Sequence, residues 1–311
     1  MDEPGAQVSQ RAMTPSETSA NQDRTLVQHK IKMTHPHVFS PGRTRPFTLF
    51  CGLILGVLLS ASAHAEESVT KAPSPEARPA ETTMDVTKRI DPTDFKHRFD
   101  VRSEYIDYGT ASMMLVVPRV EYAFSNSLAI RAELPVVHYD PGSGSGSSEG
   151  VGNLLTRLAW RAARNEGYAL VVGSEISLDT ASSANLATGK HVLAPFAFWS
   201  IDIPSAKSVF FPYVQHGVSV GGDDSREHVH YTNFRTSLLT RWPARTYSFV
   251  EVNYWFDHER SNRYSSFAKA EVGRFISPKT GFYVRPGTGL SGTDARLGIK
   301  WSMEIGMRHF F

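Results

Sequence analysis

The sequence predicts an all-β fold: a transmembrane antiparallel β-barrel of about twelve strands, closed by the carboxy-terminal strand. Three features indicate it: alternating apolar and charged residues over residues 295–311, a secretory leader near the amino-terminus, and a series of short extended runs separated by turn residues. A period of two places successive side chains on opposite faces of a strand. Charged side chains that face inward and apolar side chains that face lipid are typical of membrane barrels.

The closing strand gives the clearest signal. Its charged row consists of Arg296, Lys300, Glu304 and Arg308. Its opposite row is apolar, and Leu297 and Ile299 begin it. The spacing of Gly306, His309 and Phe311 resembles the terminal signal that outer-membrane proteins present to the barrel-assembly machinery of bacteria. The alternative for this strand alone is the last strand of a soluble β-sandwich.

Residues 1–65 are predicted to form an amino-terminal extension followed by a secretory signal peptide. Arg43 and Arg45 precede an apolar run over residues 47–59, and small residues lead to a cleavage site after Ala65. The run is too short for a membrane-spanning helix, which needs about 20 residues, so cleavage is favoured over an anchor. The polar stretch before Met33 fits no part of a signal peptide, and Met33 is the expected start.

Cleavage after Ala65 would leave a mature chain without cysteine and without net charge. Cys51 is the single cysteine, and it lies in the leader. The leader also holds six of the 33 Lys and Arg and four of the 31 Asp and Glu, which leaves 27 of each. We therefore expect no disulfide and no cysteine metal site. We also expect no cofactor, and the absence of a basic stripe excludes nucleic acid as a partner.

Residues 66–95 are rich in Pro, Ala, Glu and Thr and contain almost no aromatic residues. A segment of this composition buries too little apolar surface to fold alone. We expect a disordered Pro-rich periplasmic segment, followed by an outer-membrane β-barrel over residues 96–311.

The barrel region reads as twelve extended runs with turn residues between them, although ten or fourteen strands would also fit. The runs cover residues 99–105, 114–124, 128–136, 154–161, 168–179, 191–201, 209–220, 229–242, 250–256, 264–276, 282–290 and 295–311. Short and long connections alternate, as expected when one end of a barrel carries turns and the other carries loops. The glycine-rich stretch over residues 140–150 lacks the ending of a phosphate-binding loop and is predicted to be a mobile surface loop.

The stretch Glu149-Gly150-Val151-Gly152-Asn153-Leu154, followed by Leu158-Ala159-Trp160-Arg161, resembles the Gly-x-Gly-Asp-Leu strand entry of the meta-pathway-of-phenol-degradation family. Asn153 stands where that family usually has Asp. The resemblance in length and layout covers residues 96–311. It implies an exported barrel in the bacterial outer membrane that acts as a channel or transporter for small, often aromatic solutes, with outer-membrane lipid around it.

The charged rows that oppose the apolar rows are predicted to line the lumen. They include Arg119, Glu121, Arg131, Glu133, Arg157, Arg161, Glu175, Glu251, Lys269, Glu271, Arg285, Lys300, Glu304 and Arg308, besides Arg102 and Glu104. The signs are mixed with a slight basic excess, which favours anions. Such a lumen is either a water-filled pore or one closed by ion pairs, and a barrel of about twelve strands is narrow enough for both.

Two other classes of function remain open at this point. The first is a barrel hydrolase whose imidazole and carboxylate groups meet on the outer rim. Asp223, Asp224, His228, His230, Asp257 and His258 supply those groups, and the same residues could bind a divalent metal. The second is a structural barrel without transport. We predict a passive channel for small solutes, aromatic or anionic ones among them, with no catalytic residue and no metal ion.

Overall fold

The computed structural model describes residues 83–311, apart from residues 143, 145 and 294–297. In this part of the chain, no helix is both long and apolar enough to cross a membrane. The strands are β1 (Arg98–Asp107), β2 (Ser112–Ser125), β3 (Leu128–Glu133), β4 (Val136–Asp140), β5 (Ser148–Val151), β6 (Leu154–Asn165), β7 (Tyr168–Leu178), β8 (Lys190–Ile203), β9 (Ser208–Gly222), β10 (His230–Trp242), β11 (Thr246–Asp257), β12 (Arg263–Phe275), β13 (Thr280–Ser291) and β14 (Trp301–Phe310). A helix, α2 (Thr83–Lys88), precedes the strands, and two 3-10 helices, η1 (Pro204–Ala206) and η2 (His258–Arg260), lie in connections.

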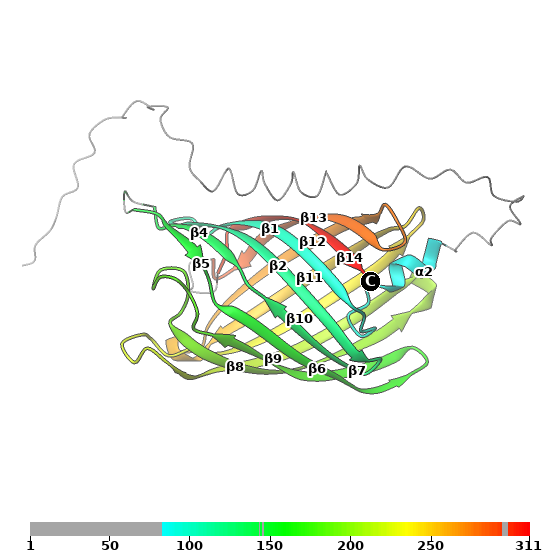
Figure 1. Ribbon diagram of the computed structural model, residues 1–311, viewed down its shortest axis with the longest axis horizontal. Coiled ribbons are helices and arrows are strands. Elements are labelled where there is room, and N and C mark those ends of the chain that lie inside the picture. Colours follow the sequence, from blue (N-terminus) through cyan, green and yellow to red (C-terminus); the bar gives the residue numbers. More distant parts are fainter. Residues whose placement is uncertain (1–82, 143, 145, 294–297) are drawn as a thin grey trace, which may run out of the picture. The chain divides into compact units, whose positions relative to one another are not determined.

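All of the strands belong to one antiparallel sheet, and β14 pairs with both β13 and β1, so the sheet closes into a barrel (Figure 1). Two wall strands are interrupted. β3 and β4 both pair with β2, and they in turn pair with β6 and β5. Counting β3 with β4 and β5 with β6 gives twelve wall strands. The predicted fold class, strand number and closing strand are confirmed.

The two interruptions follow from local sequence. Pro135 separates β3 from β4, and proline has no amide hydrogen to donate to a ladder. Gly152 lies between β5 and β6, and a Cβ atom there would lie 2.9 Å from Cγ of Pro135. A Cβ atom at Gly150 would collide with the Ser182 hydroxyl. The glycines of this motif therefore allow Pro135 and the Ser182 loop to approach the wall. Strands β4 and β5 also shorten the loop that was predicted over residues 140–150.

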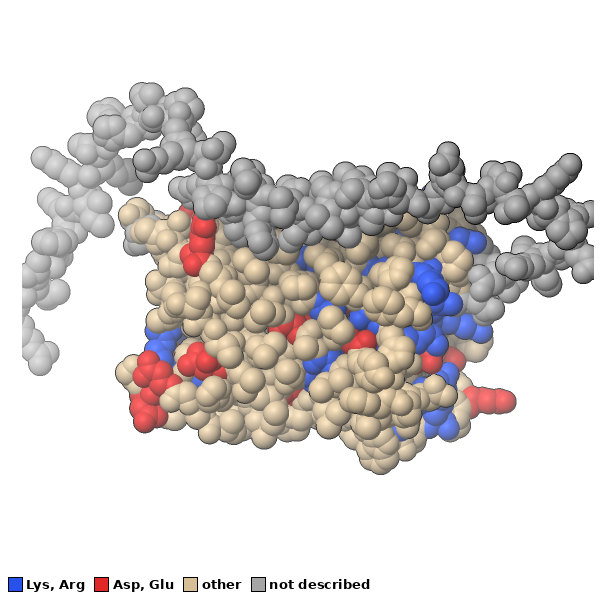
Figure 2. Space-filling model, viewed as in Figure 1, with Lys and Arg blue, Asp and Glu red and all other residues tan. Residues whose placement is uncertain are grey.

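Side chains alternate between the two faces of the wall. On β14, Trp301, Met303 and Ile305 are 45%, 45% and 54% exposed, whereas Ser302 and Glu304 are each 2% exposed and face the interior. Other strands present their large apolar side chains outward in the same way. The face seen in Figure 2 is accordingly built mostly from uncharged residues. A barrel with an apolar outer wall and charged residues inside is a transmembrane barrel.

The start of the closing strand differs from the prediction. β14 begins at Trp301, and Ile299 is only 7% exposed, so Ile299 does not belong to the outward apolar row. Arg296 and Leu297 lie outside the described residues. Lys300 still takes part in the ladder, because its amide donates to the Asp107 carbonyl and its carbonyl accepts from the Gly289 amide.

The two ends of the barrel differ in their connections. Arg98 pairs with Phe310, so β1 begins and β14 ends at the same end. This end has short turns, for example at residues 126–127, 166–167 and 243–245, and the opposite end has longer loops. Because bacterial barrels place short turns in the periplasm and long loops outside, we call these the periplasmic and extracellular ends.

The segment before β1 is folded over residues 83–95, for which disorder was expected. The predicted signal peptide and residues 66–82 lie outside the described residues. Val86, Ile90 and Phe95 are 2%, 6% and 7% exposed, and they join a core with inward-facing side chains of the wall. The wall members of this core include Phe198, Val209, Phe211, Leu239, Tyr247, Phe275 and Phe310. We name residues 83–95 the periplasmic plug. Tyr247 is 1% exposed and packs inside the barrel.

Candidate functional site

The barrel interior contains three cavities that follow one another along its axis, because each shares lining residues with the next. An outer vestibule of about 960 Å³ lies at the extracellular end. It shares Met113 and Leu186 with an apolar passage of about 390 Å³. The passage shares Leu155 and Trp255 with a charged chamber of about 370 Å³. The three cavities describe a route from the extracellular end to the periplasmic plug.

The charged chamber is lined by nine basic and six acidic side chains. The basic side chains are Arg98, Arg102, Arg119, Arg131, Arg157, Arg235, Lys269, Arg285 and Arg308. The acidic side chains are Glu104, Glu133, Glu175, Glu251, Glu271 and Glu304. The chamber therefore has a basic excess, as the sequence indicated.

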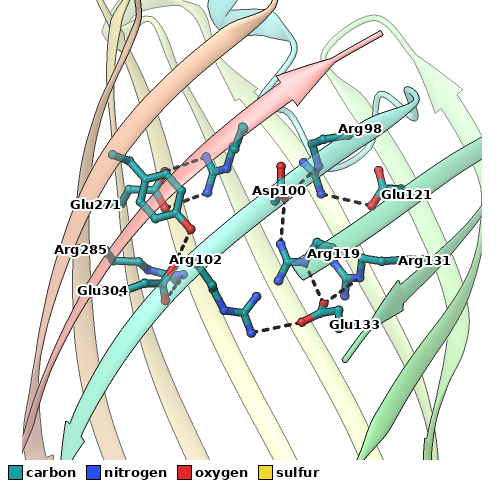
Figure 3. A network of polar contacts seen from close by, with 12 residues as sticks. Arg98, Asp100, Arg102, Arg119, Glu121, Arg131, Glu133, Glu271, Arg285 and Glu304 are labelled. Atoms are coloured by element: carbon teal, nitrogen blue, oxygen red, sulfur yellow. Dashed lines mark hydrogen bonds and ion pairs between the residues drawn. The ribbon is translucent and has the colours of Figure 1, made fainter. Parts of the chain in front are cut away.

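Most of these charges are neutralised along the wall. Arg119 places Nε 2.9 Å from Glu133 Oε1 and Nη1 3.3 Å from Asp100 Oδ2. Arg131 contacts Glu133 and Glu175 through two different nitrogens, each at 3.2 Å. Figure 3 shows this chain of contacts passing from β1 over β2 to β3. Because arginine carries five donors in a fixed fork, it can link two carboxylates in this manner.

A second group of contacts continues the network on β11 to β14. Glu271 accepts from Arg308 Nη1 at 2.7 Å and Nη2 at 2.9 Å, and from the Tyr247 hydroxyl at 2.7 Å. Glu304 accepts from the Tyr283 hydroxyl at 2.7 Å. The paired groups come from wall strands close together in the sheet order, so the ion pairs line the wall and leave the chamber between them. Its 370 Å³ far exceeds the volume of about 30 Å³ that one water occupies in the liquid.

Arg235 on β10 is the exception within the chamber. Among the described residues it forms no ion pair, and its guanidinium carbon lies 4.1 Å from the centroid of the Tyr213 ring. Cation–π contact holds an arginine without cancelling its charge. Arg235 is therefore the lining cation that is best placed to attract a negatively charged solute.

The periplasmic plug forms the floor of the chamber through Ile90 and Pro92. Two arginines of the wall hold it: Arg161 Nη1 donates to the Thr93 carbonyl at 2.9 Å, and Arg241 Nη2 lies 4.0 Å from Asp91 Oδ2. Burial raises the pKa of Asp91 above its ordinary value of 3.8, although hydrogen bonds from Thr93 and the charge of Arg241 oppose that rise. The plug thus places a carboxyl group that is costly to ionise at the end of the route.

The structure places the predicted lumen residues along this route. The chamber lining includes Arg119, Arg131, Glu133, Arg157, Glu175, Glu251, Lys269, Glu271, Arg285, Glu304 and Arg308. Glu121 accepts from Arg98 at 3.2 Å, Arg161 contacts the plug, and Lys300 lines the outer vestibule. Of the terminal residues, His309 forms a hydrogen bond between its Nδ1 and the Thr280 hydroxyl at 2.9 Å. The centroid of its ring lies 5.2 Å from that of Phe311. An assembly role for Gly306, His309 and Phe311 stays a prediction.

The acid–base pairs considered for a hydrolase do not form. Asp257 is 6% exposed and faces the lumen, where its Oδ1 accepts from the Glu259 amide at 3.2 Å. Asp223 accepts from Ser225, and His228 bonds to the Ser219 hydroxyl. His258 instead approaches two other histidines on the outer face.

Two sets of residues along the route were missed by sequence reasoning. The plug was missed because the overall composition of residues 66–95 concealed Val86, Ile90 and Phe95. Tyr213, Tyr247 and Tyr283 were missed because a tyrosine in a strand fits either face. Their partners are arginine and glutamate side chains at matching inward positions.

Comparisons with known proteins support the fold. No model of a protein family matches the chain, and no curated protein matches its sequence. Among solved structures, the COG4313 outer membrane channel from Pseudomonas putida F1 superposes with a TM-score of 0.56 at 12% identity, covering 70% of this chain and 96% of that one. The NanC porin superposes with a TM-score of 0.51 at 10% identity, covering 68% and 99%. The chain thus has the fold of outer-membrane β-barrel channels.

Proposed function

We propose that the protein is a passive channel for small solutes in the bacterial outer membrane. The observation that carries this proposal is the series of three cavities with shared lining residues inside a lipid-facing barrel. The neighbouring structures are named as a porin and an outer membrane channel, which agrees with transport. A purely structural barrel would not need an interior route lined by an ordered set of polar groups.

The lining favours small organic anions with an apolar part. A solute from outside would first meet the apolar passage, where Leu115, Val137 and Trp255 can contact a ring or an alkyl group. It would then enter the charged chamber, where basic side chains are in excess and Arg235 is unpaired. More specifically, we propose that the protein is a member of the meta-pathway-of-phenol-degradation family and that its solutes are aromatic. The Gly150–Leu154 motif supports this proposal.

Planar-bilayer recording of the purified barrel tests the proposal. We expect discrete conductance steps, and a reversal potential in a KCl gradient that shows preference for chloride over potassium. Arg235→Gln should lower that preference about twofold, because two unit charges about 10 Å apart in water interact by roughly 0.4 kcal/mol. Arg274→Gln is the matched control, since Arg274 is exposed on the outer side of β12.

The same recordings separate the alternatives. A barrel that inserts but shows no conductance steps, combined with no uptake defect in a deletion strain, would leave only a structural role. Hydrolysis of peptide or lipid substrates that disappears in Asp257→Ala and His258→Ala would support an enzyme. Conductance without anion preference would support the channel proposal but contradict the proposal that its solutes are anions.

A further inference from the structure

Three histidines from separate segments meet on the outer face of the barrel. His216 lies on β9, His230 on β10 and His258 at the start of η2. Each offers a ring nitrogen, and these nitrogens all lie within 4.8 Å of one another. The ring centroids are 4.7 Å apart for His230 and His258, and 5.1 Å apart for His216 and His230. His230 is also among the residues that line the apolar passage, whereas His216 and His258 line none of the three cavities of the route.

Strand alternation fixes the position of the cluster. Gln215 and Asn233 are 5% and 2% exposed and point into the barrel, so His216 and His230, an odd number of residues away on the same strands, point outward. His258 joins them through its contact with the Thr232 hydroxyl. Toward the middle of the wall, the rings of Phe234 and Phe256 meet edge to face with centroids 6.0 Å apart. Aromatic rings of this kind mark the border of the apolar band. Because Thr232 pairs with both His216 and Phe256, the cluster lies at that border, toward the extracellular end.

Hydrogen bonds prepare the imidazoles as ligands. His258 Nδ1 lies 2.6 Å from Asn262 Oδ1, and because an amide oxygen only accepts, Nδ1 carries the proton and Nε2 carries a lone pair. Nε2 accepts from the Thr232 hydroxyl at 2.8 Å, and a metal ion at Nε2 would replace this hydrogen bond. His216 Nδ1, 3.0 Å from the same oxygen, must then donate, which leaves its own Nε2 with a lone pair. A partner on the second nitrogen is the usual arrangement for a metal-binding histidine.

We propose that His216, His230 and His258 form a binding site for a divalent transition-metal ion such as Zn²⁺ on the extracellular rim. Imidazole nitrogens suit Zn²⁺, Ni²⁺ and Cu²⁺, whereas Ca²⁺ and Mg²⁺ require oxygen ligands. A tetrahedral zinc ion with Zn–N bonds of about 2.0–2.1 Å places its nitrogens about 3.3 Å apart. The ring nitrogens lie within 4.8 Å of one another, so each pair would have to approach by at most about 1.5 Å to reach that spacing.

A fourth ligand is close to the cluster. Glu259 follows His258 in η2, and its Oε1 lies 3.9 Å from His230 Nδ1. Three neutral imidazoles and one carboxylate form a common tetrahedral donor set for zinc. The ion would join β9, β10 and η2, and so would fix the loop after β11 against the wall.

Isothermal titration of the tag-free, detergent-purified barrel with ZnCl₂ tests the site. We expect one zinc ion per chain and at least tenfold weaker binding in His230→Gln and in His258→Gln. His228→Gln is the matched control, because His228 lies in the same loop region but bonds to Ser219 and lies outside the cluster. Its affinity should equal that of the wild type. Asn262→Ala should weaken binding by roughly tenfold, since outer partners of metal ligands contribute 10–100-fold.

The absorption spectrum after loading with Co²⁺ supplies a readout that does not depend on affinity. Intense visible bands of tetrahedral cobalt are expected for the wild type and for His228→Gln, and their loss is expected for His258→Gln. Folding of each variant is checked by its heat-dependent shift in gel mobility. Stoichiometric zinc binding that survives both cluster substitutions, or no binding by the folded wild type, would overturn the proposal. Equal binding of Ca²⁺ would overturn it as well.

Discussion

The two ends of the barrel interior are built in opposite ways. At the periplasmic end, residues of the plug and inward-facing wall side chains form an apolar core, and Val86, Ile90 and Phe95 are almost completely buried. At the extracellular end, the same wall surrounds a vestibule of about 960 Å³ lined by loop residues. The wall therefore sets the width of the barrel, whereas the periplasmic plug sets how much of the interior is open. Resistance to flow should therefore lie mainly at the periplasmic end.

Deletion of residues 83–95 is expected to have the largest effect on this asymmetry. Removal of the segment opens the floor of the charged chamber, so single-channel conductance in planar bilayers should rise several-fold. The barrel should still form, because β1 begins at Arg98 and pairs with β2 and β14. An unchanged conductance in the folded deletion variant would mean that the plug does not limit flow.

Ile90→Ala should open the same end in part. Ile90 is 6% exposed, and truncating a buried isoleucine to alanine costs about 2–5 kcal/mol. Docking of the plug should weaken by a comparable amount, which would appear as longer or more frequent high-conductance states. Ile276→Ala is the control, because Ile276 lies beside a periplasmic turn and is 66% exposed. Equal behaviour of the two variants would contradict a docked plug.

A smaller effect is expected from pH, through Asp91. Its pKa is higher in the docked plug than in the free segment, chiefly because of burial. Docking is therefore strongest below the ordinary value of 3.8, and it weakens as pH rises from 3.8 through the raised pKa. Conductance should increase over that range, and Asp91→Asn should abolish the dependence. A conductance that falls with rising pH would contradict the proposal that ionisation of Asp91 weakens docking of the plug.

The smallest change is expected at the extracellular end. Leu186 is 6% exposed and lies between the outer vestibule and the apolar passage. Leu186→Ala widens a part of the route that is already wide, and resistances in series add, so conductance should change less than in Ile90→Ala. Leu290→Ala, at an outward position that is 54% exposed, is the control. A larger effect at Leu186 than at Ile90 would invert the comparison between the two ends.

The sequence predicted the strands of the barrel wall better than it predicted the segment that fills the barrel interior. Twelve strands and the outward apolar rows follow from a period of two, which needs only local information. The inward charges at Arg119, Glu133 and Glu271 were visible for the same reason. The plug could not be recognised, because Val86, Ile90 and Phe95 fold only against the interior of the barrel, and that interior is made by strands far along the chain.

The histidine cluster illustrates the same limit. His230 and His258 were considered because they lie in polar stretches rich in Asp and His, with carboxylates as their supposed partners. His216 was not among the residues considered. Only the register, which sets Thr232 opposite His216 and Phe256, brings the three histidines together. The pairing of neighbouring strands is information that a single strand does not contain.

The seam between β1 and β14 has a consequence for how the protein is made. Asp107 pairs with Trp301 and Arg98 with Phe310, so the first and last strands must find each other across almost the whole barrel sequence. Contacts between residues so distant in the chain form slowly and late. Until synthesis is complete, β1 has no strand on one of its sides and exposes unpaired backbone groups, which invites aggregation. The nascent chain must therefore remain unfolded until its last residues are available, and closure of the seam is the step that commits it to the membrane.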